Sequence, residues 1–152
     1  MSTAPSNTTI DRATSTITFH RTFATRPEDV FDAWTRPAEV ALWWDPGGAP
    51  LSECAIDLRP GGAFKFVNRD AGHSPPFAGV YRVIERPTLL VFDALGSVGT
   101  VKLEATGGST RMTVTIRCAS TEHLEQFVKL GVDVGTDRTL DNLVAHVTKQ
   151  AA

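Results

Sequence analysis

Three polar side chains could do acid–base or electrostatic chemistry, and they are far apart in the sequence. Tyr81 carries a hydroxyl that could orient a ligand or move a proton. Arg138 could hold a carboxylate at the edge of a pocket. Asp57 could act as an acid or base, but its position in a Gly- and Pro-rich string favours a role in a turn. We therefore predict no catalytic residue.

Motifs for metals, cofactors and activated nucleophiles are absent from the sequence. No histidine has the spacing of a zinc site, the cysteines lack a CxxC spacing, and there is no GxSxG elbow, phosphate-binding loop or GxGxxG. We expect no metal and no cofactor, and we expect both thiols to be reduced core residues. The side chains concerned are His20, His73, His123, His146, Cys54 and Cys118.

A second group of candidates is aromatic or small, which suits binding better than chemistry. Phe64 and Phe66 share one face of a predicted strand. Gly131 and Gly135 lie four residues apart in a predicted helix, so they would leave space on one side of it. For each of these residues ordinary core packing is the alternative. The predicted ligand-binding residues are Trp43, Trp44, Phe64, Phe66, Phe77, Tyr81, Phe127, Gly131, Gly135, Thr136 and Arg138.

Two short helices and a meander of strands are predicted to position these side chains. A strand over 15–23 leads into a helix with Thr25 and Glu28 at capping-box spacing, and a second helix follows that Thr35 is expected to cap. Because one short helix cannot turn two adjacent indoles inward, we expect either Trp43 or Trp44 in the core and the other at a pocket mouth. Further strands are predicted over 51–58, 63–69, 77–85, 89–93, 98–105 and 110–118.

After Ser120 or Thr121, either of which can cap a helix, no proline interrupts the chain to about residue 150. We expect one unbroken helix there, roughly 40 Å long at 1.5 Å per residue. The elements predict an α+β fold, in which a curved antiparallel sheet of about seven strands wraps around this long C-terminal helix and two short helices follow the first strand.

The composition indicates one globular domain. The chain has 152 residues, of which 41% are apolar and 21% charged. Its net charge of -2 argues against nucleic acid as a partner, and no apolar run approaches a membrane span. We expect a flexible tail over 1–14, a single domain over 15–150, and a cytoplasmic location, since the chain begins without a secretory signal.

Five strings of residues follow one another along the chain: TRPEDVFDAWT (25–35), LWW (42–44), DLRPGG (57–62), GVY (79–81) and LDNL (140–143). In this order they resemble the START-like (SRPBCC) superfamily and its helix-grip fold. The likeness is strongest to the branch named after the activator of the heat-shock-protein-90 ATPase, and it covers about residues 17–147. It implies a cavity between the sheet and the long helix that in relatives receives lipids, polyketides or other apolar molecules. It does not imply a reaction.

One departure from this family bears on the cavity. Where relatives commonly have Gly-Trp in the last helix, this chain has Gly135-Thr136. A missing indole leaves room beside the core unless another side chain fills it.

Three functions follow as hypotheses. The first is a protein that binds an apolar or aromatic small molecule in an internal cavity. The second is a cyclase or dehydratase that uses the same pocket, with Tyr81, Asp57 or Arg138 moving protons. The third is a co-chaperone-like interaction module, and the chain could also form a homodimer.

Overall fold

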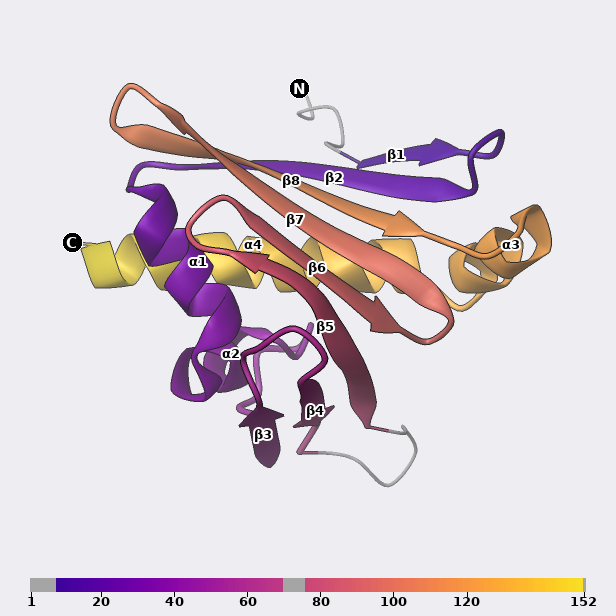
Figure 1. Ribbon diagram of the computed structural model, residues 1–152, viewed down its shortest axis with the longest axis horizontal. Coiled ribbons are helices and arrows are strands. Elements are labelled where there is room, and N and C mark those ends of the chain that lie inside the picture. Colours follow the sequence, from indigo (N-terminus) through magenta and orange to yellow (C-terminus); the bar gives the residue numbers. More distant parts are fainter. Residues whose placement is uncertain (1–7, 70–75, 152) are drawn as a thin grey trace.

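The computed structural model describes residues 8–69 and 76–151. Within them, eight antiparallel strands form one sheet in the order β1-β2-β8-β7-β6-β5-β4-β3 (Figure 1). The strands are β1 (Thr8–Asp11), β2 (Thr16–Phe23), β3 (Glu53–Ile56), β4 (Ala63–Val67), β5 (Phe77–Glu85), β6 (Leu89–Ala94), β7 (Ser97–Thr106) and β8 (Ser109–Arg117).

Four helices complete the described part of the chain. Two short ones, α1 (Pro27–Thr35) and α2 (Pro37–Trp43), follow β2, and α3 (Thr121–Lys129) precedes α4 (Val132–Ala151). Figure 1 shows α4 crossing one face of the sheet along the long axis of the molecule, with α1 and α2 at one end and α3 at the other. The predicted α+β helix-grip architecture is confirmed.

The flexible tail predicted over 1–14 overlaps the first strand, and residues 1–7 of it lie outside the described residues. Thr8 to Asp11 were expected to be loose, but they form β1, in which Ile10 pairs with Ile17 and packs against the core. The Asp11 carboxylate accepts hydrogen bonds from the backbone N–H groups of Ala13 and Thr14, and these bonds stabilise the turn into β2. Three of the four residues of β1, Thr8, Thr9 and Ile10, are β-branched, which favours a strand.

The predicted single C-terminal helix is broken at Gly131. This residue has φ +78°, a left-handed conformation that ends α3 in the manner of a glycine C-cap. Its N–H donates to the Val128 carbonyl at 3.0 Å. The cap at the start of α3 is as predicted, since the Ser120 hydroxyl accepts the His123 N–H at 3.1 Å.

Neither predicted threonine cap forms. The N-cap residues of α1 and α2 are Arg26 and Arg36, and neither side chain caps its helix. The Thr25 hydroxyl donates to the Asp29 carboxylate instead, and the Thr35 hydroxyl donates to the Phe31 carbonyl within α1. Proline in the first turn of both helices already removes one N–H that a cap would serve.

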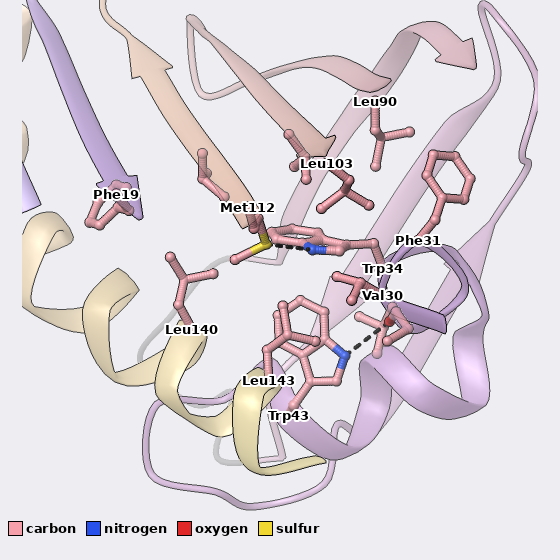
Figure 2. Close-up of a cluster of buried hydrophobic side chains, with 14 of the residues drawn as sticks. Phe19, Val30, Phe31, Trp34, Trp43, Leu90, Leu103, Met112, Leu140 and Leu143 are labelled. Atoms are coloured by element: carbon pink, nitrogen blue, oxygen red, sulfur yellow. Dashed lines mark hydrogen bonds between the residues drawn. The ribbon is translucent and has the colours of Figure 1, made fainter. Parts of the chain in front are cut away.

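Buried hydrophobic side chains cluster where α1 and α2 meet α4 and the sheet (Figure 2). The Trp34 and Trp43 rings meet edge to face with centroids 4.9 Å apart. The Trp34 N–H points to the Met112 sulfur at 3.4 Å, and the Trp43 N–H donates to the Ala33 carbonyl at 3.0 Å. Because both indole N–H groups have partners, these large rings are buried without a polar penalty. They pack close to Leu143 of α4 (Figure 2).

A partly buried arginine holds the first half of α4 against β2. The Arg21 side chain is only 11% exposed, and its guanidinium donates to the Asp137 carboxylate at 2.9 Å and to the Asp137 carbonyl at 3.1 Å. It also contacts Asp141 at 3.2 Å. Two carboxylates around one partly buried guanidinium hold strand and helix in one geometry.

The break at Gly131 predicts opposite effects for alanine at the two glycines of this region. Gly131→Ala places a side chain at positive φ and should lower the free energy of unfolding by about 1 kcal/mol. Gly135→Ala should raise it by up to about 1 kcal/mol, because the nearest atom to an added Cβ, Pro46 Cγ, is 4.0 Å away and alanine favours helix. Urea denaturation of both variants measures this. Stabilisation by both would indicate one continuous helix.

Candidate ligand-binding site

A pocket of about 430 Å³ lies between the first half of α4 and the strands β6, β7 and β8, with α3 and the segment after α2 at its edges. Its lining residues are Trp34, Trp44, Pro46, Asn68, Phe77, Phe92, Ala94, Leu95, Ser97, Gly99, Val114, Ile116, Phe127, Val132, Gly135, Thr136, Thr139 and Leu140. We call this space the central pocket.

A larger hollow of about 660 Å³ lies elsewhere, beside β2 and the second half of α4. Its lining includes His20, Arg21, Arg111 and Asp141. Arg21 is already held there by Asp137 and Asp141. This surface is a polar groove, whereas the central pocket is walled by aromatic rings, which is the usual character of a small-molecule site.

The central pocket exists because the inner face of α4 changes in bulk along its length. Gly135 and Thr136 line the pocket near the start of the helix. Further along, Leu140, Leu143 and Val147 are buried almost completely against the core. A Cβ added at Gly135 would have only Pro46 Cγ near it, at 4.0 Å, so this part of the helix leaves space beside it.

Gly99 shapes the opposite wall. It is paired with Phe92 across β6 and β7, and a Cβ added at Gly99 would lie 2.5 Å from the Phe92 ring. The missing side chain therefore lets the ring lie flat against the β7 backbone. Both residues line the pocket.

Trp44 forms the boundary between the pocket and a packed aromatic cluster. Its ring lies 4.8 Å from the Phe66 ring and 4.8 Å from the Phe77 ring, measured between centroids. Behind it, Phe64 and Tyr81 pack at 5.0 Å, and the space within this cluster is only about 10 Å³. A space that small holds one water at most, so this cluster is core.

The predicted site residues separate into two groups. Trp44, Phe77, Phe127, Gly135 and Thr136 lie in the lining of the central pocket. Of the adjacent indoles, Trp43 is the one in the core. The remaining residues lie outside this lining: Phe64, Phe66 and Tyr81 in the aromatic cluster, Trp43 beneath α1, Gly131 at the helix break and Arg138 exposed on α4.

Several lining residues escaped the sequence analysis. Phe92 and Val114 lie in predicted strands. Side chains along a strand alternate between its two faces, but the sequence does not show which face is concave. Trp34 lies in α1, and only the packing shows that it also borders the pocket. Leu95 follows a strand directly and precedes a glycine, which is the signal of a tight turn.

Polar groups in the lining are few and uncharged. The Ser97 and Thr139 hydroxyls donate to the carbonyls of Ala94 and Trp44 at 2.8 and 2.9 Å, so each can still accept a hydrogen bond. The Asn68 amide donates to Asp45 at 2.6 Å. Among the lining residues that the structure describes, none is Asp, Glu, His, Lys or Arg.

The three candidates for proton transfer do not converge. Asp57 pairs with Arg59 at 2.9 Å on the surface, Tyr81 lies in the aromatic cluster, and Arg138 is exposed. Burial raises the pKa of the Cys54 thiol to about 11, which keeps it protonated and unreactive at neutral pH.

The three histidines that the structure describes likewise do not form a cluster. His123 accepts the Ala119 N–H, and His146 contacts Glu39 at 3.1 Å. His20 lies near Thr113, and His73 falls outside the described residues. Over 8–69 and 76–151, no three potential metal ligands gather.

A sheet that grips a long C-terminal helix over an apolar pocket defines the START-like, helix-grip class of proteins. The family model described as "Activator of Hsp90 ATPase homolog 1-like protein" matches residues 24–148. The chain therefore belongs to this family, and the resemblance read from the sequence is confirmed.

Solved structures of bacterial proteins share the fold. A protein of Nitrosomonas europaea superposes with a TM-score of 0.81 at 21% identity, covering 90% of this chain and 96% of that one. A protein of Mycobacterium smegmatis gives 0.79 at 22% identity, with 95% and 98% covered. The AHSA1-like protein from Aeromonas hydrophila gives 0.71 at 22% identity, with 88% and 94% covered.

Curated proteins offer no match to the chain. Within the residues described, none of the helices combines the length and the apolar character needed to cross a membrane.

Tyr81 is the only tyrosine of the chain, so its ionisation can be followed alone. Burial, and secondarily the neighbouring Cys54, raises the pKa of its hydroxyl far above the ordinary value of about 10. We expect the folded protein to show no tyrosinate absorbance at 295 nm at pH 11, and the urea-unfolded protein to titrate near 10. Folded-state titration near 10 would place Tyr81 in an open, solvated pocket.

The same shift predicts a loss of stability at alkaline pH. The unfolded chain ionises Tyr81 above about pH 10 while the folded chain keeps it neutral, so stability falls as pH rises from there toward the folded-state pKa. Between pH 9 and 11, the free energy of unfolding of the Tyr81→Phe variant should therefore decrease less with rising pH than that of the parent.

Proposed function

We propose that the chain binds a neutral, apolar small molecule in the central pocket. The observation that carries the proposal is the lining itself, in which aromatic rings from Trp34, Trp44, Phe77, Phe92 and Phe127 surround the space and no described residue is ionisable. Burying apolar surface there contributes about 25 cal/mol per Å² before association costs.

Charge decides the class of ligand. A carboxylate or amine taken into this pocket would lose its hydration without meeting a partner of opposite charge. Hydroxyl, ether or carbonyl groups suit the lining better, because Asn68, Thr136 and Thr139 supply neutral hydrogen-bonding groups along its edge.

The volume of the central pocket limits the size of the ligand. About 430 Å³ lies toward the lower end of small-molecule pockets. The pocket therefore suits a compact molecule of two or three rings, or a short lipid-like chain, more than a long acyl lipid.

Binding without turnover is the function that the site supports best. A cyclase or dehydratase moves protons with a positioned acid or base. The described lining contains no such group, and Tyr81, Asp57 and Arg138 lie elsewhere. The interaction module, the homodimer and the cytoplasmic location stay predictions.

Two fluorescent probes of similar shape test the class of ligand. N-phenyl-1-naphthylamine is neutral, and 8-anilinonaphthalene-1-sulfonate adds a sulfonate to nearly the same rings. We expect the folded protein to bind the neutral probe at least about tenfold more tightly, because the sulfonate would be desolvated without a cation. Equal or tighter binding of the anion would contradict a neutral pocket.

Thr136→Trp tests the location. The indole should fill the pocket, keep the free energy of unfolding within about 1 kcal/mol of the parent, and abolish most binding of the neutral probe. Arg138→Trp is the matched control, because it adds the same ring two residues away at an exposed position. If Thr136→Trp instead costs about 1–3 kcal/mol and leaves probe affinity unchanged, the site is packed and the ligand binds elsewhere.

A further inference from the structure

Leu95 occupies a backbone conformation that leucine disfavours. Strands β6 and β7 are joined by two residues only, Leu95 and Gly96, with φ +55° and +76°. Such a turn needs positive φ at both positions, which is why Asn-Gly and Asp-Gly are its usual sequences. A leucine there brings its Cβ close to the backbone, whereas asparagine tolerates the conformation.

Burial does not compensate for this strain. Leu95 is 55% exposed, so its side chain stabilises the fold little. An apolar residue that is strained and also exposed brings the folded protein no evident advantage. Strain of this kind is a reason to look for a function.

The turn holds Leu95 firmly beside the central pocket. The Ser97 hydroxyl donates to the Ala94 carbonyl at 2.8 Å, which closes the turn. Gly96 lies against the His123 ring of α3, since a Cβ added at Gly96 would be 3.4 Å from His123 Cε1. The same ring packs on Phe127, with centroids 4.5 Å apart. Phe127 and Leu95 both line the pocket.

The start of α4 also contributes to the pocket lining, through Val132. In Figure 1 the β6–β7 turn lies at the same end of the molecule as α3. Because Leu95 lines the pocket and is also 55% exposed, it stands where the pocket meets the solvent.

We propose that Leu95 is a ligand-contacting residue at the entrance of the central pocket, and that its exposed side chain becomes buried against the ligand. The inference rests on the proposed function and adds the residue that closes the entrance. It accounts for leucine at a turn position that asparagine would occupy with less strain.

The proposal predicts opposite changes in stability and affinity for one substitution. Leu95→Asn should raise the thermal midpoint by about 2–4 °C, because asparagine relieves the backbone strain. It should also weaken binding of N-phenyl-1-naphthylamine by about tenfold, because roughly half a leucine side chain no longer packs on the probe. Leu95→Gly removes the same contact, so it should weaken binding to the same extent.

Leu42→Asn is the matched control, since Leu42 is a leucine of nearly equal exposure, 53%, outside the pocket lining. Its affinity for the probe should equal that of the parent. If both Leu95 variants bind the probe as tightly as the parent, or if Leu95→Asn lowers the thermal midpoint, the role of Leu95 is overturned. The proposed function would be unaffected by either result. A parent protein that does not bind the probe would overturn both.

Discussion

The structure depends on how one helix covers one sheet. Helix α4 lies across the concave face of the sheet. The side chains that it turns toward the sheet are large at one end of the helix, which we call the thick end, and small at the other, which we call the thin end. At the thick end Leu140, Leu143 and Val147 meet the core built around Trp34 and Trp43. At the thin end Gly135 and Thr136 have small side chains and line the pocket. Since the thick end and the Arg21 ion pairs fix the distance between helix and sheet, the thin end cannot collapse, and a pocket is left.

This geometry also explains where the charges are. Ionisable side chains such as Arg21, Asp57 and Arg138 lie at the surface or between secondary-structure elements. None of the described residues that line the pocket is ionisable. A neutral apolar pocket selects ligands by size and by desolvation.

Much of the fold could be predicted from the sequence, because the turn residues, the alternation of apolar and polar residues in strands, and the order of the family strings all indicate the same elements. The predictions that were wrong concern segments whose structure depends on tertiary contacts. Gly131 reads as one more glycine within a helix, and only its φ reveals a break. Thr8 to Asp11 are too few to signal a strand until β2 offers them a partner. In the pocket lining, Gly135 and Thr136 of α4 are residues that the sequence analysis had proposed, and their role in binding stays a prediction. The opposite wall was missed, because Phe92 and Gly99 form it as a cross-strand pair and a linear pattern does not show which strand faces meet.

The central claim is that the space between the thin end of α4 and strands β6 to β8 holds a neutral apolar ligand. A crystal structure of the protein with N-phenyl-1-naphthylamine tests it most directly. The account predicts the probe between the Trp44 and Phe77 rings on one side and Gly135 and Thr136 on the other, with the Leu95 side chain against it. A probe bound in the polar groove near Arg111, or a structure in which side chains of the complex close the central pocket, would contradict it.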